Sequence, residues 1–182
     1  MRVVSGSARG RKLKPVPGDS TRPILDRVKT ALFDIIRPRL PEIQMLDLFA
    51  GSGAVGIEAL SQGAAHCTFL DLNEKAARTI RENLESTGFS AQGEVRHTDA
   101  FRYLRHTTTK SFDLIYIAPP QYETLWTQAL QTIGEHPELV RSGGMLIAQI
   151  DPTEYEAINM TAFEETEQRK YGNTLLVFYS KR

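Results

Sequence analysis

The sequence predicts an α/β fold in which a mainly parallel sheet lies between layers of helices. The 182-residue chain has the length of one such domain with a short appendage. Between residues 44 and 150, short apolar runs alternate with helical segments, which is typical of a parallel sheet covered on both faces. Near the C-terminal end, two extended runs flank Gly172 and Asn173 with no helix between them, and this hairpin signal predicts an antiparallel pair.

The first elements of the chain are predicted to be a hairpin and a helix. Residues 2–5 and 11–16 are short extended runs around a glycine-containing turn, so a small hairpin is expected. The helix should begin near Pro23, because proline is favoured in a first turn and Ser20 or Thr21 can cap it. Apolar residues then recur at helical spacing: Ile24, Val28, Ala31, Leu32 and Ile35.

The remaining elements alternate between strand and helix until the final hairpin. Extended segments are predicted at residues 44–50, 66–72, 93–98, 112–117, 144–150, 164–171 and 174–180. Helices are predicted at residues 54–62, 74–87, 100–106 and 122–136. Together they predict a seven-stranded sheet whose last two strands are antiparallel.

Composition excludes several classes of protein. Hydrophobic residues make up 41% of the chain and charged residues 24%, and no apolar run is long enough for a membrane span. The N-terminus lacks the apolar stretch and cleavage site of a secretory signal. Cys67 is the only cysteine, which indicates a reducing compartment, so we expect a cytoplasmic protein of a bacterium or an organelle. The histidines lack metal-ligand spacing, so no metal site is expected: His66, His97, His106 and His136.

Charge is distributed unevenly although the net charge is zero. Residues 1–40 hold ten basic and three acidic side chains, whereas residues 41–182 are acidic in balance. We therefore expect two parts, a basic N-terminal extension at 1–40 that binds a polyanion and a core at 41–182. The alternative is a solvated basic surface without a partner. The candidate phosphate contacts are Arg2, Arg9, Arg11, Lys12 and Lys14.

A glycine-rich turn joins the first core strand to the following helix. Small residues there let the backbone approach a ligand, and the helix N-terminus favours polar or anionic groups. The spacing of Gly51, Gly53 and Gly56 matches the dinucleotide fingerprint, which alone is a weak signal. Asp47, four residues before the first glycine, favours a ligand with an amino group over a nicotinamide nucleotide. A tight turn without any ligand is the alternative. The predicted ligand contacts are Asp47, Phe49, Ala50, Gly51, Ser52 and Gly53.

Two further acids end the next two strands. Asp71 lies about twenty residues after the glycines, where related sites place the acid that binds a ribose diol. Asp99 could accept a hydrogen bond from an adenine amino group or only cap the next helix, and both interpretations stay open. Leu72 and Ala100 are their neighbours in the predicted site. Amino, ribose and adenine contacts together predict S-adenosylmethionine as cofactor.

The fourth core strand ends in the residues Ala118, Pro119, Pro120, Gln121 and Tyr122. This segment is similar to the polar-Pro-Pro-aromatic motif of amino-group methyltransferases, in which a side chain and a proline carbonyl accept hydrogen bonds from the target amine and the aromatic ring stacks on a flipped base. The resemblance implies that Ala118, Pro119, Pro120 and Tyr122 form the catalytic turn.

The chain as a whole resembles the RsmD-type family of bacterial small-subunit (16S) ribosomal RNA guanine-N2 methyltransferases. The resemblance covers nearly the full length and is carried by residues 2–6, 9–13, 21–23, 26–28, 46–56, 58–60, 119–120 and 171–174. It implies a Rossmann-like class I fold and a guanine N2 as target. It also implies a Thr21-Arg22-Pro23 turn that closes over the cofactor, with Arg22 as a contact. The implied partner is ribosomal RNA or an assembling small subunit, and a monomer is favoured.

The catalytic turn departs from the family pattern at two positions. Ala118 stands where the family has Asp or Asn, and Gln121 stands where it has an aromatic residue. Three explanations are open. The Pro119 carbonyl and another acceptor suffice while Tyr122 stacks on the base, or the target atom differs, or the chain binds RNA without methylating it.

Overall fold

The computed structural model describes residues 1–18, 23–107 and 109–182. The helices are α1 (Asp26–Ile36), α2 (Ala54–Ser61), α3 (Glu74–Thr87), α4 (Ala100–His106) and α5 (Leu125–Glu135), with short 3-10 turns η1 (Arg37–Arg39), η2 (Pro137–Leu139) and η3 (Pro152–Glu154). The strands are β1 (Gln44–Asp47), β2 (His66–Asp71), β3 (Gly93–His97), β4 (Phe112–Ile117), β5 (Val140–Ile150), β6 (Phe163–Tyr171) and β7 (Thr174–Lys181).

The seven strands form one sheet in the order β3-β2-β1-β4-β5-β7-β6. The strands from β3 to β5 in this order are parallel, whereas β7 pairs antiparallel with both β5 and β6. The predicted fold class, with a mainly parallel seven-stranded sheet and an antiparallel C-terminal pair, is therefore confirmed. The strand order changes direction between β1 and β4, and open α/β sheets bind ligands at the carboxyl ends of the strands beside such a switch.

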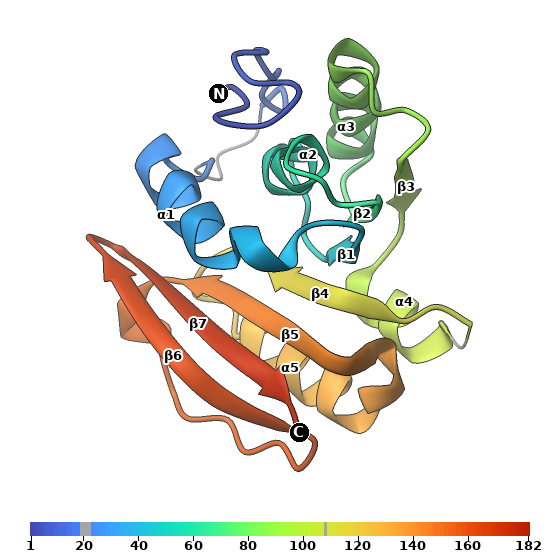
Figure 1. The fold of residues 1–182 in the computed structure, drawn as a ribbon. Coiled ribbons are helices and arrows are strands. Elements are labelled where there is room, and N and C mark those ends of the chain that lie inside the picture. The colour runs from blue at the N-terminus through green and yellow to red at the C-terminus, as the bar shows by residue number, and fades with distance from the viewer. Residues whose placement is uncertain (19–22, 108) are drawn as a thin grey trace.

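Helices cover both faces of the sheet (Figure 1). On one face, α1, α2 and α3 pack Leu32, Ile57 and Ile80 into one hydrophobic cluster with the strands. On the other face, α4 and α5 pack Leu104 and Leu130 into a second cluster. The strands are thus buried on both sides, which explains their nearly continuous apolar sequences.

The N-terminal hairpin is present in shortened form. Arg2 and Lys12 form an isolated antiparallel bridge, and the Val3 N–H donates to the Arg11 carbonyl at 2.9 Å. Val3 and Leu13 are buried in the same hydrophobic cluster as α1, α2 and α3. This segment therefore packs on the core, beside α1 and α2 (Figure 1). The division of the chain at residue 40 stays a prediction.

A buried ion pair anchors this N-terminal segment. Lys29 Nζ of α1 lies 3.1 Å from Glu58 Oε1 of α2, and both side chains are almost fully buried. Lys29 also donates to the Arg2 carbonyl at 2.7 Å, while the Glu58 carboxylate accepts from the N–H groups of Val4 and Ser5 at 2.8 and 3.0 Å. These hydrogen bonds offset the cost of burying two charges, so residues 2–5 are held between two helices.

Two helices begin later than predicted. The helix α1 begins at Asp26 instead of near Pro23, because its N-cap residue Leu25 is extended. The predicted caps Ser20 and Thr21 lie outside the described residues. The helix α5 begins at Leu125 instead of residue 122, because the backbone upstream of it passes through left-handed conformations that a helix cannot contain.

The strand β5 begins earlier than predicted, at Val140 instead of residue 144. Phe112 of β4 pairs with Val140, and the register then shifts before Leu114 pairs with Met145. The polar and glycine residues of this irregular stretch hid the first part of the strand in the sequence.

Candidate cofactor and substrate site

The glycine turn after β1 has the backbone that the sequence predicts. Gly51 and Gly53 adopt positive φ values of 57° and 83°, which other residues adopt at a cost. Gly56 is required for a different reason, since a Cβ there would lie 2.3 Å from the Phe69 ring. The helix α2 therefore packs directly on β2. A hydrogen bond of 2.8 Å from the Ala50 N–H to the Leu70 carbonyl fixes the turn to the same strand.

Asp47, the last residue of β1, is a buried acid without full hydrogen bonding. Its residue is 1% exposed, and among the described residues its Oδ2 has no hydrogen-bond partner. The pKa of the carboxyl is raised to about 7, chiefly by burial; the Gly56 N–H opposes the shift, and the nearby Asp71 charge adds to it. An unsatisfied buried carboxylate is costly. A cationic ligand group would supply the missing donor, so this residue fits the ammonium group of the predicted cofactor.

Asp71 at the end of β2 holds two backbone segments together. Its Oδ2 accepts from the Gly51 N–H and its Oδ1 from the Asn73 N–H, both at 2.9 Å. The acid thus fixes the glycine turn relative to β2, in addition to the ligand role predicted for it. The next residue, Leu72, is 68% exposed and offers an apolar surface beside the carboxylate.

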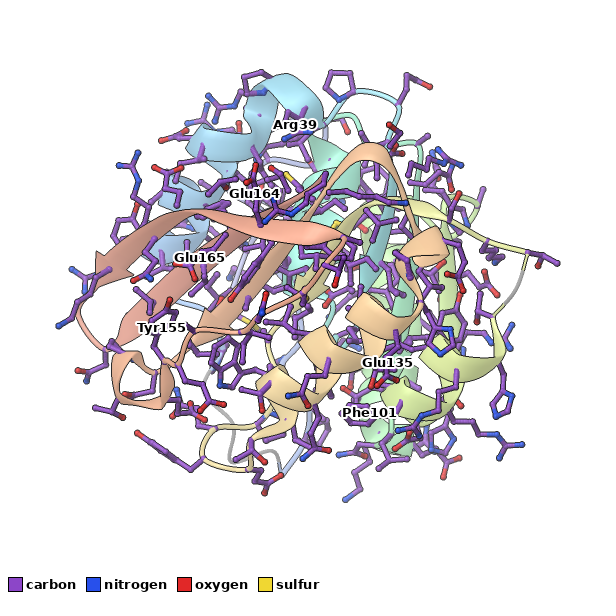
Figure 2. All side chains as sticks on the ribbon, turned by 90° about the horizontal axis from the view of Figure 1, so that it is seen from below. Arg39, Phe101, Glu135, Tyr155, Glu164 and Glu165 are labelled. Atoms are coloured by element: carbon purple, nitrogen blue, oxygen red, sulfur yellow. The ribbon has the colours of Figure 1, made fainter. Side chains whose placement is uncertain are left out.

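Asp99 caps α4, since its carboxylate accepts from the Arg102 N–H at 2.9 Å. The capping interpretation is therefore confirmed, and a contact to adenine stays a prediction. Ala100 is buried behind it. The Phe49 ring meets the Phe101 ring edge to face, with centroids 6.3 Å apart, so the segments after β1 and β3 lie together. Figure 2 shows Phe101 on α4.

The turn after β4 carries the predicted catalytic residues. Ala118 and Pro119 are half-buried and Pro120 is exposed. The side chain of Tyr122 is largely exposed, its φ is 64°, and its hydroxyl donates to Asp151 Oδ2 at 2.9 Å. Ala118 leaves this turn without a side-chain acceptor at the position where the family has one.

Two residues of this site escaped sequence analysis, Asp151 and Glu154, which follow β5. The signal was present, because an acid, a proline and a second acid three residues after the first form a capping box at a helical turn. Only the fold brings this box beside the turn after β4.

The predicted phosphate contacts Arg2, Arg9, Arg11, Lys12 and Lys14 are all exposed. Two of them form exposed ion pairs: Arg2 Nε lies 4.0 Å from Asp26 Oδ2, and Lys14 Nζ lies 3.2 Å from Glu82 Oε2. Exposed ion pairs of this kind contribute little and leave the basic groups accessible. Their contact with RNA stays a prediction.

Asn83 connects the basic segment to the glycine turn, which sequence analysis also missed. Its Oδ1 accepts from the Lys14 N–H at 2.8 Å, and its Nδ2 donates to the carbonyls of Lys14 and Ser52 at 3.0 and 2.9 Å. Asn83 is 1% exposed. Its position three residues after Ile80 and seven after Ala76, on the apolar face of the helix, was the available sequence signal.

Several predictions concern features away from these strand ends. Arg22 lies outside the described residues. Two hollows lie at the amino ends of the strands, one lined by Arg39 and Gly143 and the other by His66 and Arg141. No predicted site residue lines either hollow. Among the described residues, no group of three side chains suited to a metal occurs, and no helix is long and apolar enough to cross a membrane.

Comparison with known proteins places the chain in a family. The family model described as "Conserved hypothetical protein 95" matches residues 1–180. The YlbH protein of Bacillus subtilis is 38% identical over 185 residues, covering 100% of both chains. The ribosomal RNA small subunit methyltransferase D of Haemophilus influenzae is 36% identical over 138 residues, covering 75% of this chain and 72% of that protein.

Solved structures share the fold. An Escherichia coli protein superimposes with a TM-score of 0.87 at 24% identity, covering 100% of this chain and 97% of that chain. An RNA methyltransferase of Salinibacter ruber, solved in complex with S-adenosyl-L-homocysteine, superimposes with a TM-score of 0.68 at 12% identity, covering 88% and 94%. With a class I methyltransferase fold and relatives along its whole length, the chain belongs to the RsmD-type family of methyltransferases.

Proposed function

We propose that the chain binds S-adenosylmethionine at the carboxyl ends of β1, β2 and β3 and transfers its methyl group to the exocyclic N2 of a guanine in small-subunit ribosomal RNA. The observation that carries this proposal is the buried Asp47 carboxylate, whose Oδ2 has no partner among the described residues. Family membership and the name of the Haemophilus influenzae relative support the RNA substrate.

Each residue at the strand ends would contact a different part of the cofactor. Asp47 would accept from its ammonium group and Asp71 from its ribose hydroxyls. Leu72 would lie against adenine, with Asp99 and Ala100 at the adenine edge. The backbone of the glycine turn, from Phe49 to Gly53, gives the close approach, since no side chain fills the space at Gly51. Arg22 is proposed to close over the bound molecule. When bound, this cofactor supplies an electrophilic methyl group on a sulfonium.

The turn after β4 would place the target amine. The Pro119 carbonyl would accept one of its hydrogen bonds and thereby orient the nitrogen lone pair for methyl transfer. Tyr122 offers an exposed ring for base stacking, a contact worth about 1–3 kcal/mol in single-stranded nucleic acid complexes. Pro119 and Pro120 fix the backbone direction of the turn. Methyl transfer to an amine mainly requires alignment and exclusion of water, so no strong base is assigned.

Ala118 favours a second candidate function, which is RNA binding without methyl transfer. A methyl side chain cannot accept the hydrogen bond that Asp or Asn provides in the family, and loss of such an interaction slows reactions by orders of magnitude. In this case the fold and the basic segment would serve ribosome assembly, and the cofactor pocket would be retained.

Transfer of a labelled methyl group to immature small subunits decides between the two. We expect the wild type to label 16S RNA and nuclease digestion to yield N2-methylguanosine. Pro119→Ala should lose transfer while its cofactor affinity stays within about twofold, and Glu135→Ala on the exposed side of α5 should match the wild type. Ala118→Asp should keep or raise transfer. Tight RNA binding with no label would establish the second function, and a different methylated nucleoside would overturn the guanine N2 assignment.

A further inference from the structure

The segment after β5 holds the turn after β4 through two hydrogen bonds to one residue. The Tyr122 hydroxyl donates to Asp151 Oδ2 at 2.9 Å, and the Tyr122 N–H donates to Glu154 Oε1 at 2.7 Å. Both acceptors are carboxylates, which form stronger hydrogen bonds than neutral groups do. One residue is thus held at its backbone and at the far end of its side chain.

The two carboxylates are also held by hydrogen bonds within their own segment. Asp151 uses its other oxygen, Oδ1, for the N–H and hydroxyl of Thr153, at 2.9 and 2.7 Å. Glu154 uses Oε2 for the Asp151 N–H at 3.3 Å, which completes the capping box of η3. Each acid therefore commits one oxygen to η3 and the other to Tyr122. The capping box alone would need only Oδ1 of Asp151 and Oε2 of Glu154.

The bonds hold a backbone conformation that the sequence does not favour. Tyr122 and Thr124 have φ values of 64° and 55°, in the left-handed region that residues with a Cβ adopt only when their surroundings impose it. The Tyr122 side chain is exposed, so burial does not impose it. Its hydrogen bonds to Asp151 and Glu154 hold Tyr122 in this conformation, whereas Thr124 is bonded to Thr127 and Gln128 of α5.

Packing extends this attachment to the edge of the sheet. The Trp126 ring, in the first turn of α5, stacks on the ring of Tyr155, with centroids 6.3 Å apart and an angle of 25°. The Tyr155 hydroxyl donates to Glu165 of β6 at 2.7 Å. Figure 2 shows Tyr155 near Glu165. The segment that carries Asp151 and Glu154 is therefore itself anchored.

We propose that Asp151 and Glu154 are positioning residues that present the Tyr122 ring to the target base. The ring is fixed at its hydroxyl and at its backbone, yet its surface is open, which suits a stacking platform. In the family pattern the aromatic residue directly follows the two prolines, whereas here it comes one residue later. The left-handed turn and its two carboxylate contacts would compensate for that extra residue. The proposal rests on the proposed function, because it takes an RNA base as the partner of the ring.

A double-mutant cycle tests the proposal. Tyr122→Phe removes the hydroxyl and keeps the ring. Asp151→Ser removes the acceptor and keeps an N-cap oxygen for η3. Each variant should lower the single-turnover rate of methyl transfer to RNA about fivefold or more, since a hydrogen bond to a charged group is lost. The double variant should be no slower than either single one. Glu156→Ala, an exposed acid of the same segment, is the matched control and should keep the wild-type rate.

Two readouts separate positioning from general destabilisation. The affinity for S-adenosylhomocysteine should stay within about twofold in all variants. Amide hydrogen exchange of residues 118–124 should accelerate in Glu154→Ala, which removes the acceptor of the Tyr122 N–H, with exchange of the sheet unchanged. Wild-type rates in both single variants, additive losses in the double variant, or unchanged exchange in Glu154→Ala would overturn the proposal.

The positioning role can also be tested by measuring RNA affinity, even if the protein does not methylate RNA. If the wild type binds RNA and transfers no methyl group, Tyr122→Ala should weaken RNA binding about tenfold or more. Asp151→Ser combined with Glu154→Ala should give much of the same loss while Glu156→Ala gives none. Unchanged affinity in the combined variant would refute the platform and its positioning together.

Discussion

The pKa of Asp47 should make folding and the proposed cofactor binding depend on pH in opposite directions. Burial raises this pKa from 3.8 to about 7. The unfolded chain releases the proton at lower pH than the folded chain, so the contribution of this group to stability is full below pH 3.8 and is lost as pH rises through 7. One pKa unit corresponds to about 1.4 kcal/mol, and the loss between pH 5 and pH 8 is therefore about 2–3 kcal/mol.

Asp47→Asn isolates this effect, because the amide has nearly the same shape and does not titrate. Urea unfolding at pH 5, 6.5 and 8 measures it. The free energy of unfolding should fall less with pH in the variant, and the difference between the two slopes should amount to about 2–3 kcal/mol over this range. Other titrating groups act equally in both proteins and cancel in the comparison.

Cofactor affinity should change the other way, since an ammonium group binds the ionised carboxylate. At pH 6 about a tenth of the wild-type carboxyl groups are ionised, so S-adenosylhomocysteine should bind about eightfold more weakly than at pH 7.5. Calorimetry at the two pH values measures the ratio. Two results would refute the reasoning that Asp47 is a buried acid that binds a cationic ligand group. One is an equal pH dependence of the free energy of unfolding in wild type and Asp47→Asn, and the other is an affinity for S-adenosylhomocysteine that does not change with pH.

Three further outcomes are expected. Asp71→Ala should weaken S-adenosylhomocysteine binding about tenfold or more by calorimetry, because one hydrogen bond to a charged group contributes roughly 1.5–3 kcal/mol; equal affinity would remove Asp71 from the site. Lys29→Met should lower the free energy of unfolding by about 3–5 kcal/mol in urea, because it leaves the Glu58 carboxylate buried without its cation; a loss below 1 kcal/mol would contradict this. Arg9→Glu with Arg11→Glu should lower RNA affinity and reduce the log–log salt slope by about one unit per lost contact, with cofactor affinity unchanged; an unaltered slope would mean a solvated surface.

Local sequence predicted the elements at the carboxyl ends of β1, β2 and β3 well, because each of the signals is short-range. The glycine turn, the acids that end β1 and β2, the acid that follows β3, and the helices after them depend on residues a few positions apart. Parallel strands placed their carboxyl ends at one edge, so the three acids could be assigned to one site without coordinates. The sequence also indicated the Asp99 cap as one of two interpretations, since a side-chain oxygen before a helix commonly accepts a hydrogen bond from an N–H group of its first turn.

The contacts that escaped prediction join residues far apart in the chain. Asn83 meets Lys14 across 69 positions, and Glu58 meets Val4 across 54. Nothing in either local segment specifies its partner. The start of α5 was misplaced for a related reason: the helical pattern around Tyr122 is compatible with a helix, and long-range hydrogen bonds to Glu154 and Asp151 impose another backbone.

The sequence by itself determined the fold class, the seven strands, the family and the acids at the carboxyl ends of β1, β2 and β3, because hydrophobic periodicity, turn chemistry and short motifs are local properties. Only the tertiary structure decided that Asp47 is buried with an unpartnered oxygen, that a Lys29–Glu58 pair fixes the basic segment, and that Asp151 and Glu154 hold Tyr122. Desolvation and hydrogen-bond satisfaction depend on which distant segments surround a group, and that is set by packing alone.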